Sequence, residues 1–143
     1  MVSAFFNALS GRLRIELSEA PVPITPNLSN KRAPQNARIE SLRLDAYLIE
    51  DDDFRPLTAR ELDAIALDAP QVRLRGLGEE ETTSHAAPDR IAFRVRDLLA
   101  AVEAHERQTR GASKWFDGVD VHHVFFEGLR LQEDGSWQVS WGS

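Results

Sequence analysis

Five short stretches of this chain alternate an apolar residue with a charged residue, arginine in nearly every case. This is the two-residue repeat of a β-strand, whose successive side chains point to opposite faces of a sheet. Each stretch therefore predicts a strand with one apolar and one charged face, and together they favour a sheet that buries one side. The stretches are residues 12–17, 42–44, 72–75, 93–96 and 129–131.

The size and composition predict a globular protein. The chain has 143 residues, of which 42% are hydrophobic and 28% are charged. These values are typical of globular domains rather than of disordered chains. We expect a single domain, 1–143, with a core of its own. The chain contains no cysteine, so a disulfide framework, a thiolate zinc site and a cysteine nucleophile are excluded.

The same data bear on localisation. The first nine residues lack the basic segment and the long apolar run of a secretory signal. No apolar run in the sequence reaches the ~20 residues of a membrane span. Together with the absence of cysteine, these features predict a cytoplasmic protein. Arginine outnumbers lysine by 15 to 2, a bias that we attribute to a GC-rich bacterial genome.

The net charge of −6 restricts the partners. Nucleic acids and acidic membranes bind surfaces with an excess of lysine and arginine, so both are disfavoured. RNA-binding sheets also interleave several aromatic residues with the basic ones, and here only Tyr47 is in phase. We therefore expect another protein, of basic character, as the partner. A homo-oligomer stays open as an alternative.

Local signals predict two helices. Thr58 and Glu61 have the spacing of a capping box, in which each side chain accepts a hydrogen bond from the backbone of the other residue. This predicts a helix at 59–67. Asp97 can cap a second helix that runs to about residue 109.

The remaining segments are predicted as strands and loops. The strands lie at 12–17, 38–49, 71–76 and 90–96, with the last strands beyond residue 118. Residues 18–37 carry four of the seven prolines, which predicts a Pro-rich arm or long loop. Residues 79–88 are polar and without periodicity, which predicts a loop.

The phase of the apolar residues predicts the geometry of the final hairpin. Leu129 and Leu131 share a face with the apolar residues of the last strand only if the loop has three or five residues. We therefore predict an odd loop length. Glu127 interrupts the apolar phase with a charge, which predicts a β-bulge or a strand break at Glu127 and Gly128.

The order of these elements predicts the fold class. Two strands are followed by a helix, two more strands, a second helix and three strands. This order is typical of a two-layer α+β domain. We predict a mainly antiparallel sheet of about six or seven strands with two helices packed on one face.

One pair of residues suggests metal chemistry. On a regular strand, Asp120 and His122 would share one face, about 6–7 Å apart, and could bind one divalent ion together. A catalytic centre would need a third ligand from another part of the chain. This pair defines an alternative hypothesis, a metal-assisted enzyme.

Three groups of residues are candidates for binding a protein partner. An acidic run could face a basic surface, arginines on strand faces could bind an anionic ligand, and an aromatic pair could anchor a contact. The candidates are Glu50, Asp51, Asp52, Asp53, Arg73, Arg75, Arg94, Trp115 and Phe116.

The function follows from weighing these observations. The chain has no nucleophile elbow, phosphate-binding loop, dinucleotide fingerprint or metalloprotease helix, so the sequence leans away from an enzyme and predicts no cofactor. The first hypothesis is a small non-enzymatic protein-binding module of immunity, adaptor or antitoxin type. The alternatives are the metal-assisted enzyme and a structural or assembly subunit that exchanges its Pro-rich arm between copies.

Overall fold

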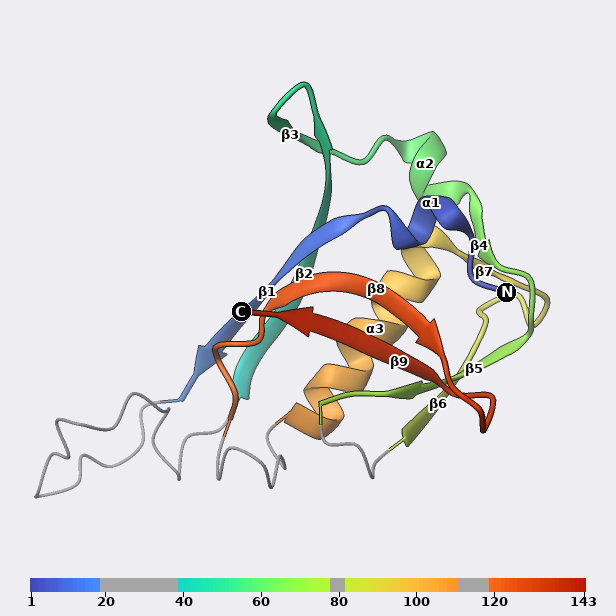
Figure 1. The fold of residues 1–143 in the computed structure, drawn as a ribbon. Coiled ribbons are helices and arrows are strands. Elements are labelled where there is room, and N and C mark those ends of the chain that lie inside the picture. Colours follow the sequence, from blue (N-terminus) through green and yellow to red (C-terminus); the bar gives the residue numbers. More distant parts are fainter. Residues whose placement is uncertain (19–38, 78–81, 111–118) are drawn as a thin grey trace, which may run out of the picture.

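The computed structural model describes residues 1–18, 39–77, 82–110 and 119–143. These ranges contain three helices and nine strands (Figure 1). The helices are α1 (Ala4–Asn7), α2 (Ala59–Asp63) and α3 (Val95–Thr109). The strands are β1 (Ser10–Leu17), β2 (Ile39–Glu50), β3 (Asp53–Pro56), β4 (Ile65–Leu67), β5 (Gln71–Arg75), β6 (Thr82–Ala86), β7 (Phe93–Arg94), β8 (Phe125–Leu131) and β9 (Trp137–Gly142).

Seven of the strands form one sheet in the order β3-β2-β1-β8-β9-β5-β6, while β4 and β7 pair separately. Neighbouring strands of the sheet run antiparallel, except that β5 and β9 are parallel. The protein is therefore a mixed α+β fold with a mostly antiparallel sheet, as its sequence predicts. None of the helices in the described ranges has the length and apolar character that crossing a lipid bilayer requires.

The helices differ from the prediction of two helices side by side on the sheet. Only α3, with 15 residues, is long enough to cover it, and Figure 1 shows this helix crossing one face. The shorter α2 packs against α3, and α1 packs against β8. The predicted packing of two helices on one face is not confirmed.

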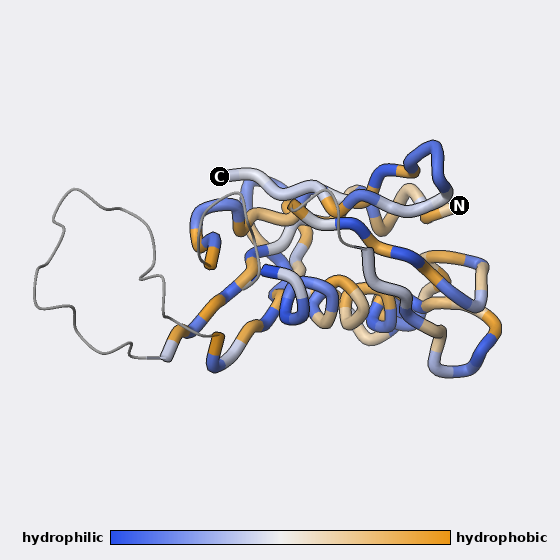
Figure 2. The backbone as a smooth tube through the Cα atoms, turned by 90° about the horizontal axis from the view of Figure 1, so that it is seen from below, coloured by the Kyte–Doolittle hydropathy of each residue, from blue (hydrophilic) through white to orange (hydrophobic). Residues whose placement is uncertain are grey.

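Four of the five alternating stretches lie in strands of the sheet, namely β1, β2, β5 and β8. Most of their apolar residues point toward α3 and are almost fully buried, whereas the arginines between them lie on the outer face. Ile15 and Leu17 are partly buried, and Leu131, at the end of β8, is 57% exposed. Figure 2 shows the same alternation as changes of colour along the tube. The residues buried on the α3 side include Leu13, Leu42, Leu44, Val72, Leu74 and Leu129.

The fifth stretch shows where the predicted strand at 90–96 is wrong. Only Phe93 and Arg94 form a strand, and the chain enters α3 at Val95. The carboxylate of Asp97 accepts the backbone N–H of Arg94 at 2.9 Å, so Arg94 is the N-cap residue and Asp97 lies three positions into the helix. A carboxylate in the first turn also interacts favourably with the helix dipole.

The capping box is confirmed, but the helix that it begins is shorter than predicted. Thr58 Oγ1 accepts the Glu61 N–H at 3.1 Å, and Glu61 Oε1 accepts the Thr58 N–H at 2.9 Å. The helix ends at Asp63 instead of residue 67 because Ile65–Leu67 pairs with β7 as strand β4. Tertiary strand pairing overrides the local helical pattern at this point.

The predicted loop at 79–88 contains a strand. Residues Thr82–Ala86 form β6 and pair with β5 along its whole length. This strand lies at one edge of the sheet and has no apolar periodicity, since its residues are mostly polar. Threonine nevertheless favours strands because of its β-branched side chain.

Both predictions for the final hairpin are confirmed. Leu131 lies opposite Trp137, which leaves a five-residue loop between the strands. The register shifts between Phe126 and Leu129, and Gly128 at the shift has a φ of +99°. This bulge lets Phe126 and Leu129 face the core together although they are an odd number of residues apart.

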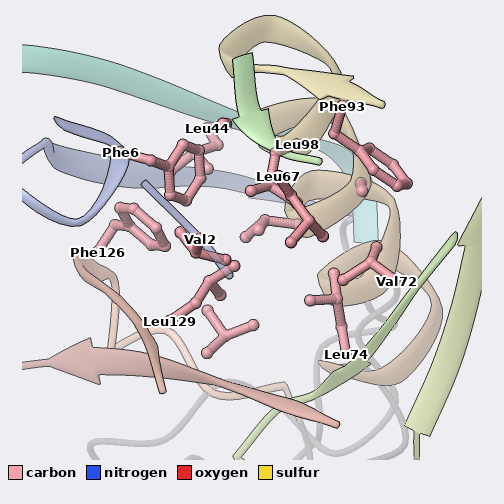
Figure 3. Close-up of a cluster of buried hydrophobic side chains, with 14 of the residues drawn as sticks. Val2, Phe6, Leu44, Leu67, Val72, Leu74, Phe93, Leu98, Phe126 and Leu129 are labelled. Atoms are coloured by element: carbon pink, nitrogen blue, oxygen red, sulfur yellow. The ribbon is translucent and has the colours of Figure 1, made fainter. Parts of the chain in front are cut away.

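The core lies between the sheet and α3 (Figure 3). Phe6 of α1 packs edge-on against Phe126 at 5.7 Å, and Phe126 packs in the same way against Trp141. Phe93 and Leu98 belong to the same buried cluster at the start of α3. The core is therefore one continuous apolar layer.

The free edge of β2 is closed by side chains of α3. The backbone N–H of Leu44 donates to Glu103 at 3.2 Å, and Arg107 donates to the carbonyl of Leu42 at 2.8 Å. Glu103 and Arg107 also form an ion pair with each other at 3.0 Å. An unpaired strand edge can recruit other chains, so these contacts protect part of β2.

Candidate functional site

The hairpin formed by β2 and β3 projects beyond the rest of the sheet (Figure 1). The last residue of β2 that pairs with β1 is Tyr47, which lies opposite Ser10. Beyond this point β2 pairs with β3 alone, through Glu50 and Asp53 at the tip. A two-stranded ribbon has little stability of its own, so the projecting part depends on its turn and on its side-chain contacts.

The predicted acidic run forms the tip of this hairpin. Asp51 and Asp52 are the two residues of the turn and have φ angles of +52° and +64°. Positive φ at both turn positions matches the twist of a hairpin and is normally provided by Asn-Gly. Aspartate adopts this backbone conformation less readily than glycine. The chain thus has two carboxylates where glycine or asparagine would be more stable.

One arginine organises the base of the acidic tip. Arg55 donates to Glu50 at 2.6 Å and to Glu61 at 2.8 Å. The hydrogen bonds from Arg55 and from the Thr58 backbone lower the pKa of Glu61 to about 2. Asp51, Asp52 and Asp53 form no ion pair with any of the residues in the described ranges. Their three negative charges remain uncompensated at the tip.

Apolar side chains lie directly below these charges. Ile49 and Phe54 are opposite each other in the hairpin and are 60% and 67% exposed. The Phe54 ring also contacts Tyr47 edge-on, with ring centroids 4.9 Å apart. A cross-strand apolar pair at this exposure leaves much apolar surface in water, and such surfaces often mark contacts with a partner.

A second group of polar residues is buried beside the C-terminal turn of α3. Glu106 and Arg110 form an ion pair at 3.1 Å in which both side chains are at most 2% exposed. Arg110 also donates to the backbone carbonyls of Asp120 and His123, and its guanidinium lies 5.0 Å from the Trp141 ring. Burial raises the pKa of Glu106 above its ordinary value, against the effect of Arg110.

A histidine chain adjoins this ion pair. Thr83 Oγ1 lies 2.7 Å from His105 Nδ1 and 2.6 Å from His85 Nε2. Burial lowers the pKa of His105 to about 4, and the neighbouring His85 and Arg110 add to this effect. The Nε2 atom of His105 has no hydrogen-bond partner among the residues that the structure describes. The group is enclosed and tightly packed, so we assign it to the stability of the fold.

Asp120 and His122 do not form the predicted pair. Residues 119–124 are not a strand, and Asp120 is buried while His122 is exposed. Asp120 accepts the backbone N–H groups of His122 and His123, and its second oxygen lies 2.8 Å from His123 Nδ1. Burial opposes the charge of Asp120, but these donors and Arg110 outweigh it and lower its pKa.

The structure therefore gives no geometric support to the metal-assisted enzyme. Asp120 serves as a local backbone cap, a role in which aspartate is common. Among the described residues, no group of three histidine or acidic side chains could hold a metal ion.

The arginine candidates make contacts within the protein. Arg73 and Arg75 both reach Asp134 of the β8–β9 loop, the first by a hydrogen bond to its carbonyl and the second by an ion pair at 2.7 Å. Arg94 donates to the backbone carbonyl of Asp63 at 2.7 Å. These interactions stabilise the outer face of the fold. Trp115, Phe116 and the Pro-rich segment, apart from Ser18, lie outside the described residues.

Sequence reasoning placed the acidic run correctly on the surface but missed the strand that follows it. The signal was present in the apolar residues on both sides of the two central aspartates, Ile49 and Phe54. Aspartate tolerates the left-handed conformation better than most residues, so an Asp-Asp pair between apolar residues indicates a two-residue turn.

No protein-family model, curated protein or solved structure matches this chain.

Proposed function

We propose that this chain is a non-enzymatic protein-binding module whose β2–β3 hairpin docks on a basic surface of another protein. One observation carries the proposal: the exposed pair Ile49 and Phe54 lies directly below three uncompensated aspartates on a projecting hairpin. An apolar centre with a charged rim is the usual composition of a protein interface. The charge of the rim selects a basic partner and accelerates its association.

The turn gives separate support. Two aspartates at positive φ make the protein less stable than an Asn-Gly turn at the same position would. Backbone strain of this kind is common at functional positions. The carboxylates are not needed for the turn itself, because Asn-Gly forms the same turn without charge. A role in contacting a partner accounts for their presence.

The turn also allows a sharp test. The double variant Asp51→Asn/Asp52→Gly removes two charges and should increase the free energy of unfolding by about 1 kcal/mol, because the strain is relieved. If the tip binds a basic partner, affinity should fall at least tenfold while stability rises. The matched control Asp68→Asn/Glu133→Gln removes the same charge from two exposed positions elsewhere and should leave affinity unchanged.

The partner can be identified with a photo-reactive benzoylphenylalanine in place of Phe54, and with the same group at Ile91, 68% exposed, as the control position. We expect position 54 to give one cross-linked basic protein in 1:1 ratio, and position 91 to give none. The affinity for this purified protein, measured by calorimetry, should decrease with salt. Equal cross-linking from both positions, or equal affinity of the double variant and wild type, would refute the proposal.

A further inference from the structure

The outer face of the sheet carries a row of three side chains from neighbouring strands. Arg12 of β1 lies opposite Asp45 of β2 and opposite Phe125 of β8. The Arg12 guanidinium carbon is 6.0 Å from the centre of the Phe125 ring, within the range of a cation–π contact. The row lies on the face opposite α3, beside the base of the projecting hairpin.

Two other arginines form ion pairs with Asp45, the acidic residue of this row. Arg14 Nε lies 2.5 Å from one oxygen of Asp45, and Arg43 Nε lies 3.0 Å from the other. Arg14 and Arg43 are themselves directly opposite each other, an arrangement of like charges that Asp45 bridges. Arg12 therefore has no carboxylate partner among the described residues.

Four of these residues, Arg12, Arg14, Asp45 and Phe125, also line a hollow of about 790 Å³, whereas Arg43 does not. Its wall includes Arg12 and Arg14 together with the aromatic rings of Tyr47, Phe54 and Phe125. It also extends to apolar residues beside and within α2 and α3, namely Leu57, Leu62 and Leu99. Small-molecule sites have this size, and they combine apolar or aromatic walls with a few polar groups that fix the ligand. A guanidinium offers a planar fork of N–H donors that fits a carboxylate or phosphate.

We propose that this hollow binds a small aromatic oxyanion, an aryl phosphate or an aryl carboxylate. The anionic group lies on the Arg12 guanidinium, and the aromatic ring of the ligand packs against the three aromatic side chains. Arg14 and Arg43 share the single carboxylate of Asp45 and Arg12 has none, so this part of the sheet has the excess positive charge that attracts the ligand. A long polyanion is disfavoured because most arginines of this face are already ion-paired, and the protein as a whole carries a charge of −6.

The proposal does not rest on the function of the hairpin tip, because it uses none of the aspartates there, although Phe54 belongs both to the hollow and to the proposed protein interface. It is tested by titrating the ¹⁵N-labelled full chain with phenyl phosphate and with benzoate, and following the backbone amide signals. Inorganic phosphate and benzyl alcohol are the two control probes, because each has only one half of the predicted ligand.

We expect saturable shifts near Arg12 and Tyr47 with at least one of the two aryl anions, and at least tenfold weaker binding of both control probes. Arg12→Gln should weaken the binding at least tenfold. Arg130→Gln is the matched control and should have no effect, since Arg130 is also exposed on the outer face but is not part of the hollow.

Three results would overturn the proposal: shifts that do not saturate, equal weakening by the two variants, or binding of inorganic phosphate as tight as that of both aryl anions. Circular dichroism of each variant establishes that the fold is retained. If only one of the two aryl anions binds, the proposal stands, and the result shows whether the hollow prefers a phosphate or a carboxylate.

Discussion

Acidification from pH 7 to pH 5 should destabilise this protein through one side chain, His105. The imidazole has no exposed surface and is enclosed by β6 and the last turns of α3. The groups that face it are His85, Arg110 and Glu106. Nε2 has no hydrogen-bond partner among the described residues. In the neutral tautomer with the proton on Nδ1, this N–H donates to Thr83, and the ring has no other N–H that would be buried without a partner. Protonation would add such an N–H and a charge in the interior.

The magnitude follows from the difference between the two states. Burial lowers the pKa of His105 to about 4 in the folded protein, against 6.5 in the unfolded chain. The unfolded chain therefore binds the proton first, and stability falls as the pH decreases below 6.5. Each pH step costs about 1.4 kcal/mol until the folded pKa is reached, so the free energy of unfolding should be lower by about 2 kcal/mol at pH 5 than at pH 7.

Other groups affect this window less or in the opposite direction. The pKa values of Glu61 and Asp134 are lowered to about 2, so their contributions are lost only as the pH falls below their unfolded values near 4. The raised pKa of Glu106 has the opposite sign, because protonation of Glu106 favours the folded state. His85 is also buried in part, which lowers its pKa and adds to the effect of His105.

The assay is urea unfolding followed by circular dichroism at pH 7 and pH 5. The variant His105→Asn keeps a donor near the position of Nδ1 but cannot titrate. It should lose most of the pH dependence, although its stability at pH 7 is lower. The control variant His122→Asn, at an exposed position, should retain the dependence of the wild type. An equal loss of stability in the wild type and in His105→Asn would refute the reasoning.

Two further substitutions test the packing, both by urea unfolding. Asn7→Ala should lower the free energy of unfolding by about 2 kcal/mol, because Asn7 accepts the N–H of Leu129 at 2.9 Å and donates to its carbonyl at 3.2 Å, which stabilises the bulge. Asn7→Asp keeps the acceptor and should cost less. A loss below about 0.5 kcal/mol in Asn7→Ala, which is the usual range of a surface substitution, would contradict this role. Gly76→Ala should cost about 2 kcal/mol, because its Cβ would lie 2.6 Å from His105 Nε2. Combined with His105→Asn, which lacks that nitrogen, its effect should be less than additive, and strict additivity would show that the clash is elsewhere.

The parts of the fold that could be predicted are those specified by residue phase. The requirement that apolar residues share one face of the sheet predicts the orientation of Leu13, the pairing of Leu131 and the bulge at Gly128. A shift of the strand register by one residue would turn a charged side chain into the core. The alternation of apolar residues and arginine at 93–96 predicted a longer strand, but a two-residue strand followed by the first turn of a helix gives the same alternation over four residues. Only the hydrogen bond from Arg94 to Asp97 distinguishes the two.

The elements that could not be predicted depend on partners distant in the sequence. Ile65 is part of a strand because it pairs with Arg94, and Thr83 is part of a strand because it pairs with Leu74. Nothing in either segment alone indicates this pairing. The strand that the metal hypothesis assumed at Asp120 is wrong for a related reason. The Asp120 carboxylate instead accepts hydrogen bonds from the backbone N–H groups of His122 and His123.

The arginines that first suggested a charged sheet face separate into two classes in the structure. Most are neutralised by an acidic residue from a turn or a neighbouring strand: Arg75 by Asp134, Arg96 by Asp63, and Arg14 by Asp45. These pairs are exposed, so each contributes little to stability. Their main effect is to remove positive charge from most of the outer face, which explains how a strongly alternating arginine pattern is compatible with an acidic protein.

Arg12, Arg94 and Arg130 are the exceptions, and the contrast between Arg12 and Arg130 gives the aryl-anion proposal its specificity. Neither has a carboxylate partner among the described residues, and both lie on the outer face. Arg12 is held over the Phe125 ring and lines the hollow, whereas Arg130 lies opposite Gln138, outside it. If unpaired charge alone attracted anions, the two positions would respond alike. A difference between Arg12→Gln and Arg130→Gln therefore measures what the hollow and its aromatic walls add.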